Sequence, residues 1–133
     1  IARQGWILLT GGRASGVMEA ASQGAKAVSG SLTVGILPDE KTKVSRYVDL
    51  AILTDLGNAR NNVNVMSSDV IVACGLGGAG TVSEVALALK AKKHVILLDA
   101  EKTGAGLFRN LAPQLVSTAA SPEEAVQMIK DLL

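Results

Sequence analysis

Short apolar runs alternate along the chain with segments whose apolar residues recur at helical spacing. The runs predict five strands, at residues 6–10, 32–37, 50–54, 69–74 and 94–98. The helical spacing predicts four helices, one after residue 15 and the others at 59–67, 81–91 and 122–133. Apolar strands that alternate with helices are typical of a buried parallel sheet with right-handed crossovers. The pattern therefore predicts an α/β fold, a three-layer doubly wound parallel sheet of the Rossmann-like, nucleotide-binding type.

The same pattern predicts which helix residues face the core and which segments are loops. The residues expected to face inward are Val17, Met18, Ala21, Ala25 and Val28 in the first helix, Val82, Val85, Ala86 and Leu89 in the third, and Val126, Ile129 and Leu133 in the last. Residues 38–46 are polar and charged and predict a mobile surface loop, and Gly104–Gly106 predicts another loop.

The length of 133 residues suits one domain with its own core, so we expect a single Rossmann-like domain over residues 1–133. The opening Ile1-Ala2-Arg3-Gln4-Gly5 reads as the last turn of a helix closed by glycine. We therefore expect that an N-terminal strand and part of a helix are missing from this sequence.

Composition narrows the classes of partner. The formal charge is +1, aromatic residues make up 2%, and no stripe of Lys or Arg appears, so no nucleic-acid partner is expected. The single cysteine excludes an intramolecular disulfide and suits a reducing compartment. No apolar run approaches the ~20 residues that span a bilayer, and no secretory leader is visible, which predicts a cytoplasmic protein without a membrane partner.

The most informative stretch is Asp69–Glu84, in which an apolar run ends in Gly75, Gly77, Gly78 and Gly80 before a helix opens near Thr81. Glycines let a ligand approach the backbone closely, and the first N–H groups of a helix point at whatever lies there. With the helix dipole, this arrangement favours a phosphate group. The stretch predicts a protein that holds a phosphorylated small molecule.

Other interpretations of these residues remain open. Gly75, Gly77 and Gly80, with Asp99 further on, match a dinucleotide fingerprint, although too few residues follow for a second nucleotide-binding half. The glycines could also serve only a tight turn. Thr81 and Glu84 fit a capping box, in which both residues would only stabilise the helix. A carboxylate at Glu84 would repel a phosphate, so a functional Glu84 would act on another part of the ligand.

Further candidates lie outside that stretch. Gly11 and Gly12 follow the first strand and could form a second backbone cradle, or only a turn. Arg60 at a helix start, and Arg13 more weakly, could bind a phosphate or simply be solvated. Cys74 is expected to be a small buried residue, with a thiolate that touches the ligand as the alternative. The lone His94 has no partner at metal-ligand spacing, so no metal site is predicted.

Three motifs in order resemble those of one superfamily. Leu76–Glu84 resembles the P-G-G-x-G-T-x-x-E signature of the LOG-like Rossmann superfamily, Gly11–Met18 is similar to its G-G-x-x-x-G-x-M turn, and Asn58–Asn61 is similar to its arginine segment. That superfamily includes cytokinin-activating phosphoribohydrolases, lysine decarboxylase-like proteins and molybdenum cofactor carriers. The resemblance covers nearly the whole chain.

Two departures point to the carrier branch. The hydrolases have lysine where this chain has Asn61, and their signature opens with proline where this chain has Leu76. The resemblance implies a carrier that binds molybdenum cofactor, a phosphorylated pterin, without converting it. It also implies a homo-oligomer, either a dimer or a tetramer. The implied ligand-binding residues, besides Gly11 and Gly12, are Arg60, Gly77, Gly78, Ala79, Gly80, Thr81 and Glu84.

The alternative implied by the same resemblance is an enzyme. The residues that match Arg60 and Glu84 form the catalytic pair of the phosphoribohydrolases, and both are retained here. In that case the chain would cleave the N-glycosidic bond of a nucleoside 5′-monophosphate, with the Glu84 carboxylate stabilising an oxocarbenium-like transition state. No catalytic metal is expected in either case.

Overall fold

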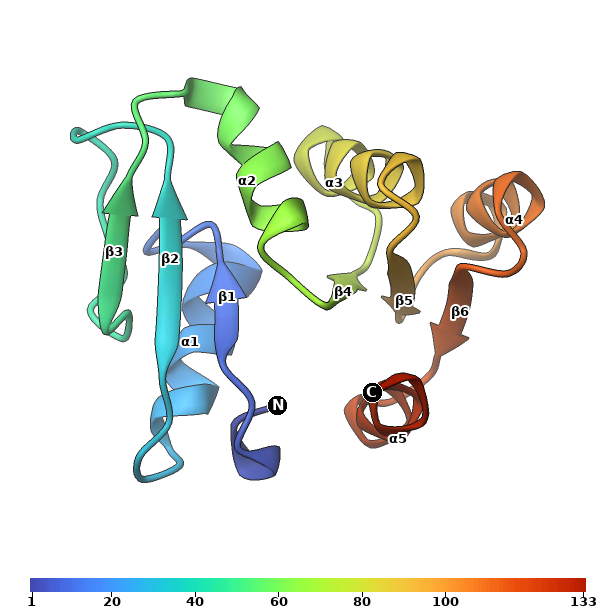
Figure 1. The fold of residues 1–133 in the computed structure, drawn as a ribbon, viewed down its shortest axis with the longest axis horizontal. Helices are drawn as coiled ribbons and strands as arrows, with labels where there is room; N and C mark the ends of the chain where they lie inside the picture. Colours follow the sequence, from blue (N-terminus) through green and yellow to red (C-terminus); the bar gives the residue numbers. More distant parts are fainter. The chain divides into compact units, whose positions relative to one another are not determined.

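The computed structural model describes all residues from 1 to 133, and they form two compact units, residues 1–64 and 65–133 (Figure 1). Each unit contains one three-stranded sheet in which every neighbouring pair of strands is parallel. The predicted α/β class with parallel strands is confirmed. None of the helices is long and apolar enough to cross a membrane.

The first unit holds a sheet in the order β1-β2-β3. Its elements are the 3-10 turn Ala2–Gln4, β1 (Leu8–Thr10), α1 (Gly16–Lys26), β2 (Thr33–Leu37), β3 (Leu50–Leu53), the 3-10 turn Gly57–Ala59 and the start of α2 (Arg60–Met66). Helix α1 packs on β1 and β2, with Ser22 and Ala25 as its buried residues.

Two glycines let the first unit pack its backbone tightly. Gly12 has a φ of 70°, and a Cβ added there would lie 2.9 Å from the Cα of Gly35 in β2. A Cβ on Gly35 would in turn lie 2.7 Å from the Cα of Gly12. Because backbone atoms cannot move aside as a side-chain end can, glycine is required at both positions.

Part of segment 38–46 is held by backbone hydrogen bonds, although its polar sequence predicts a mobile loop. The N–H of Ser45 donates to the carbonyl of Gly12 at 2.9 Å, and the N–H of Ala14 donates to the carbonyl of Lys43 at 3.0 Å. Val44 forms an isolated bridge with Arg13. Residues 43–45 are thus fastened to the turn after β1, and the prediction of a mobile loop is wrong for them.

The second unit holds a sheet in the order β4-β5-β6. Its elements are β4 (Val70–Cys74), α3 (Ala79–Lys90), β5 (His94–Leu98), α4 (Lys102–Leu111), β6 (Val116–Ala119) and α5 (Pro122–Leu132). One face of the sheet packs against α3 and α4 in a cluster that includes Val95 and Leu97 of β5. Strand side chains alternate between faces, so the fully buried Ile96 points to the other face, where α5 contacts β5 and β6. This unit is therefore three layers deep.

Several predicted details are wrong. Gly104 and Gly106 lie within helix α4 rather than in a loop, because Ala105 and Phe108 pack into the core. Strand β6 was not predicted. Helix α3 begins at Ala79, and its buried residues are Val85 and Ala88. Residues predicted to face inward but found exposed are Val17, Val82, Ala86 and Leu133.

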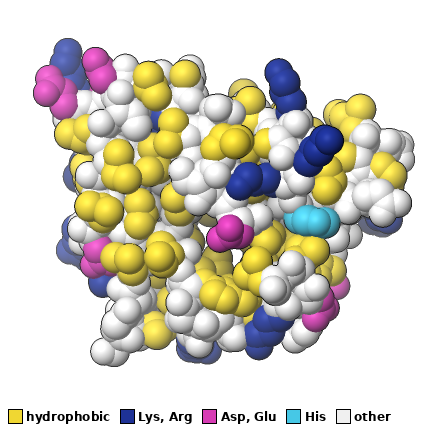
Figure 2. Space-filling model, in the orientation of Figure 1, with side chains coloured by type: hydrophobic (Ala, Val, Ile, Leu, Met, Phe, Trp, Pro, Cys, Tyr) yellow, Lys and Arg dark blue, Asp and Glu magenta, His cyan; other side chains and the backbone are white.

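Strand β3 is not the buried strand that its sequence predicts. All four of its residues are exposed to solvent, and the exposed fraction of Leu53 is 57%. Strand β3 is the edge strand of its sheet, and α1 packs on β1 and β2. Figure 2 shows apolar side chains gathered on the visible face of this unit.

Candidate functional site

The start of α3 carries the glycines singled out by the sequence. Gly75 follows β4 with a φ of 69°, and its N–H donates to the carbonyl of Leu98 in β5 at 2.8 Å. The chain then reaches Gly78, whose extended backbone (φ −138°, ψ 145°) begins the helix without a side-chain cap. The first N–H groups of α3 therefore point outward from the carboxyl-end edge of the sheet.

Three of these glycines have no packing reason within the chain. A Cβ added to Gly77, Gly78 or Gly80 would meet no atom within 4 Å, and none of the three has a positive φ. Of the three, only Gly80 lies inside the helix, where glycine costs about 0.5–1 kcal/mol relative to alanine. Neither turn geometry nor packing explains that cost, which favours the close approach of a ligand.

The alternative interpretation of Thr81 and Glu84 as a capping box does not agree with the structure. Because Gly78 rather than Thr81 is the N-cap, Thr81 lies inside the first turn of α3 and Glu84 lies in the next turn. A capping box needs an N-cap side chain, which glycine lacks. The start of α3 is therefore not closed by its own side chains.

Helix α5 shows the contrast within the same unit. The Ser121 hydroxyl accepts the N–H of Glu124 at 3.1 Å, and the Glu124 carboxylate accepts the N–H of Ala120 at 2.7 Å. Pro122 occupies the first position of the helix. The sequence predicted this start correctly, and its N–H groups are used by the chain itself.

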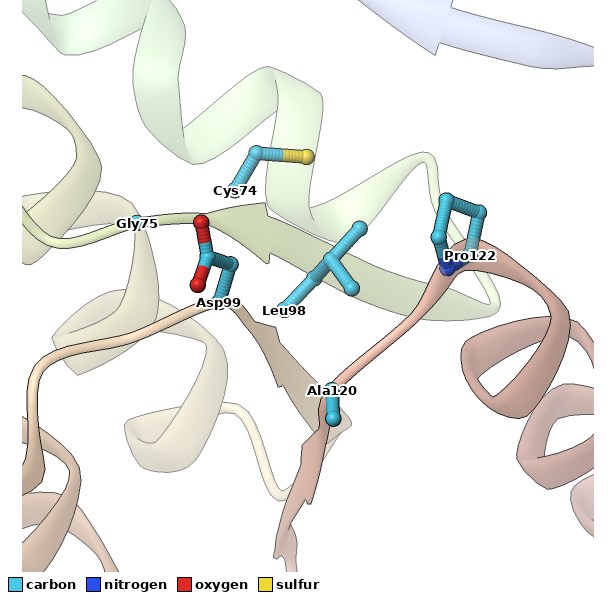
Figure 3. A pocket seen from close by; sticks show the side chains of 6 residues that line it. All are labelled: Cys74, Gly75, Leu98, Asp99, Ala120 and Pro122. Carbon is cyan, nitrogen blue, oxygen red and sulfur yellow. The ribbon is translucent and has the colours of Figure 1, made fainter.

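A hollow of about 520 Å³ lies at the carboxyl ends of the strands in the second unit (Figure 3). Its walls come from the ends of β4 and β5, from the residue after β6 and from the start of α5. The lining residues are Cys74, Gly75, Leu98, Asp99, Ala120 and Pro122. Ligands of parallel α/β sheets bind at such carboxyl-end edges, and the volume is within the range of small-molecule sites. The sequence did not indicate Ala120 or Pro122, because β6 was missed.

Cys74 is exposed at the edge of this hollow, so the prediction of a buried cysteine is wrong. Partial burial of the sulfur raises the pKa of the Cys74 thiol above its usual value. At about pH 7 the group therefore keeps its proton, which disfavours the alternative of a thiolate that touches a ligand. No group of three or more His, Cys, Asp or Glu residues could hold a metal ion.

In the first unit the structure brings Arg60 and Gly11 together. Arg60 is only 8% exposed. A Cβ added to Gly11 would lie 2.7 Å from the Nη2 of Arg60 and 2.7 Å from the Sδ of Met18. Gly11 thus makes room for the guanidinium of Arg60. The N–H of Gly12 donates to the Thr10 hydroxyl at 3.0 Å, so it does not form the open cradle that the sequence suggested.

Comparison with known proteins gives a consistent result. The profile of the SLOG cluster4 family matches residues 1–129. A protein of Archaeoglobus fulgidus described as uncharacterised is 48% identical over 98 residues, which are 74% of this chain and 63% of that protein. The match therefore spans less than two thirds of this curated relative.

Solved structures match over nearly the whole chain. The molybdenum cofactor binding protein of Rippkaea orientalis is 58% identical, with a TM-score of 0.94 over 99% of this chain and 80% of that one. The Moco carrier protein of Chlamydomonas reinhardtii is 50% identical, with a TM-score of 0.92. The match covers 99% of this chain and 80% of that one. The protein TM1055 is 35% identical, with a TM-score of 0.80. The match covers 98% of this chain and 81% of that one. This chain shares their α/β, Rossmann-like fold.

Proposed function

The chain belongs to the SLOG cluster4 family, and from that membership and its structural neighbours we propose that it is a carrier for molybdenum cofactor. Proteins that share half or more of its sequence and nearly all of its fold are a molybdenum cofactor binding protein and a Moco carrier protein. The carrier binds the phosphorylated pterin as cargo and releases it unchanged. This function agrees with the interpretation of the sequence as a phosphate-binding protein.

The observation that carries the proposal is the open space at Gly77, Gly78 and Gly80, where a Cβ would meet no atom of the chain within 4 Å. A phosphate approaching the start of α3 needs backbone N–H groups within hydrogen-bond distance, which a Cβ on its path would prevent. We assign the phosphate to the segment from Gly77 to Thr81, which includes Ala79. Glu84, one turn further along α3, would contact a part of the cargo that carries no negative charge.

Within the first unit we assign an anion-binding role to Arg60. Its planar guanidinium suits phosphate oxygens, and Gly11 fixes where it lies. Gly11 and Gly12 then contribute by packing, since they position Arg60 and the turn after β1, and the N–H of Gly12 is taken by the Thr10 hydroxyl.

Substitution of Gly80 by alanine tests this function directly. Gly80→Ala places a methyl group where the chain leaves open space, and it improves helix propensity by about 0.5–1 kcal/mol. We expect the variant to fold with equal or higher stability and to bind molybdenum cofactor at least about tenfold more weakly, which is about 1.4 kcal/mol. Binding is measured by the cofactor retained after gel filtration, and stability by thermal denaturation.

Gly24→Ala is the matched control. Gly24 lies in α1, also has open space around its Cα, and should gain similar stability with unchanged binding. A wild-type protein that retains no molybdenum cofactor would refute the carrier function, and Gly80→Ala binding as tightly as the wild type would refute the phosphate site.

The same preparation tests the enzyme alternative. A carrier should leave adenosine and isopentenyladenosine 5′-monophosphates intact when free base is quantified by chromatography. Free base that appears with the wild type and disappears with Glu84→Gln would instead identify a phosphoribohydrolase. We also propose, from the resemblance, that the carrier is a homo-oligomer. The single cysteine, which suits a reducing compartment, supports a cytoplasmic location.

A further inference from the structure

Asp99 belongs to the glycine-rich fingerprint of the sequence but has no role in the proposed phosphate site. It directly follows β5 and lines both the hollow of about 520 Å³ and a neighbouring hollow of about 350 Å³. Its carboxylate takes part in no hydrogen bond or ion pair within the chain. In Figure 3 the carboxylate lies beside the end of β4, near Gly75.

The backbone of Asp99 turns sharply directly after β5. Its φ is 52°, in the left-handed region that non-glycine residues seldom adopt, and its N–H donates to the carbonyl of Ala119 at 3.1 Å. Aspartate adopts this region more readily than most residues. Here the turn places a carboxylate at the sheet edge where ligands of such folds bind.

The other walls of the larger hollow suit a flat ring. Leu98, Ala120 and Pro122 are apolar, and Gly75 contributes no side chain. Glu124 is the other acid that lines a hollow here. It lines only the smaller one, and its Oε2 already accepts the N–H of Ala120. Asp99 is therefore the open carboxylate acceptor of a site that is otherwise mostly apolar.

A carboxylate with these surroundings recognises adjacent N–H donors rather than a phosphate. Two parallel N–H groups on one edge of a ring can donate to its two oxygens, as a guanidinium does. The 2-amino-4-oxo-pyrimidine ring of a pterin has such an edge, formed by the ring N–H and the 2-amino group. Guanine has the same edge, whereas adenine presents one donor and one acceptor.

We propose that Asp99 is a specificity-determining residue that binds the 2-amino-4-oxo-pyrimidine edge of the pterin through paired hydrogen bonds. The inference rests on the proposed carrier function and adds to it the part of the cargo that the second unit selects. The phosphate at the start of α3 and the ring edge at Asp99 are then recognised by different chemistry.

Substitution of Asp99 by asparagine tests the inference without disturbing the backbone, because asparagine tolerates a positive φ well. The amide matches the donor and acceptor of adenine and mismatches the two donors of guanine. By titration calorimetry with GMP and AMP, we expect the wild type to prefer GMP by about tenfold or more. Asp99→Asn should lose or reverse that preference, and should bind molybdenum cofactor about tenfold more weakly.

Asp55→Asn is the matched control, because Asp55 is also an exposed aspartate with a positive φ (54°) and lines neither hollow. It should retain the affinities of the wild type. If Asp99→Asn binds molybdenum cofactor as tightly as the wild type, the inference is refuted and the carrier function stands. If the wild type binds no molybdenum cofactor, the carrier function is refuted. In that case the nucleotide affinities test the role of Asp99. Equal wild-type affinities for GMP and AMP, or no binding of either, would refute the role. A preference for GMP that reverses in Asp99→Asn would support it.

Discussion

Asp49 is the most strongly stabilised ionised carboxylate in the first unit. Lys26 Nζ donates to its Oδ1 at 2.8 Å, and the N–H of Thr33 donates to its Oδ2 at 2.8 Å. The hydrogen bond from Lys26 is the main cause that lowers the pKa of Asp49 from 3.8 to about 2, and the bonds from Thr33 add to it. These contacts join the end of α1 to the start of β2.

The lowered pKa makes stability depend on pH in a defined window. The unfolded chain binds a proton at Asp49 near pH 3.8 and the folded chain only near pH 2, so the stabilisation is complete above that window and is lost as the pH falls through it. We expect Asp49→Asn to lower the melting temperature at about pH 7, with a difference that shrinks between about pH 4 and about pH 2.

Thermal denaturation across this pH range measures the effect. Glu40→Gln is the control, because Glu40 is an exposed carboxylate with no hydrogen bond, and its effect should be small at every pH. A difference for Asp49→Asn that stays constant down to about pH 2 would contradict the assignment.

Among single residues, the sequence predicted that a glycine-rich turn leads into α3, and the role of its glycines in binding remains a prediction. The packing reasons for Gly11 and Gly12 were not predicted. The predicted cradle at Gly11 and Gly12 needed free N–H groups. The structure shows that Gly11 makes room for the Arg60 guanidinium, and that Gly12 packs on Gly35. Contacts between residues so far apart in sequence leave no local signal, so spacing alone could not separate a ligand cradle from a packing site.

At the scale of elements, helix α4 shows how packing overrides propensity. Gly104 and Gly106 disfavour a helix, yet Ala105 and Phe108 are buried in the core of the second unit. Gly104 has a steric reason, because a Cβ there would lie 2.9 Å from the Cδ1 of Leu76. Gly106 has open space around it.

The two glycines of α4 should therefore respond differently to alanine. Gly106→Ala should raise stability by about 0.5–1 kcal/mol, or roughly 2–5 °C in melting temperature. Gly104→Ala should gain less or lose stability, because Leu76 must move aside in the glycine turn. Equal gains in thermal denaturation would show that Leu76 does not restrict Gly104.

Local signals explain which elements the sequence could predict. The start of α5 was predicted because Ser121, Pro122 and Glu124 form a complete cap within four residues. Strand β6 was missed because Ser117 and Thr118 interrupt its apolar pattern. The N-cap of α3 was placed at Thr81 instead of Gly78, because a glycine cap has no side chain to indicate it.

At the scale of the molecule, the predicted homo-oligomer remains a prediction, and β3 offers a surface for it. Leu50 and Ile52 are 52% and 41% exposed and, being two residues apart on a strand, point to the same face. An exposed apolar edge strand is liable to pair with another chain unless it is covered. Helix α3 is a less suitable surface, since its Ala88 is buried in the chain's own core.

We expect the wild type to sediment as a dimer or tetramer and Leu50→Lys/Ile52→Lys to sediment as a monomer with an unchanged circular dichroism spectrum. The control Leu107→Lys/Leu111→Lys replaces two exposed leucines of α4 and should remain oligomeric. A monomeric wild type would show the oligomer prediction to be wrong. An oligomeric β3 variant would place the interface elsewhere.

Gly77, Gly78 and Gly80 also have a consequence for the evolution of proteins related to this chain. Gly12 and Gly35 are held by the fold, because each leaves no room for a Cβ on the other. A Cβ at Gly77, Gly78 or Gly80 would meet nothing in the chain, so under the proposed function it is the cargo that favours glycine there. A descendant that no longer carried this cargo could replace these three glycines by drift and still keep its fold. Side chains at these three positions, with Gly12 and Gly35 retained, would therefore mark a lineage that has lost the carrier role.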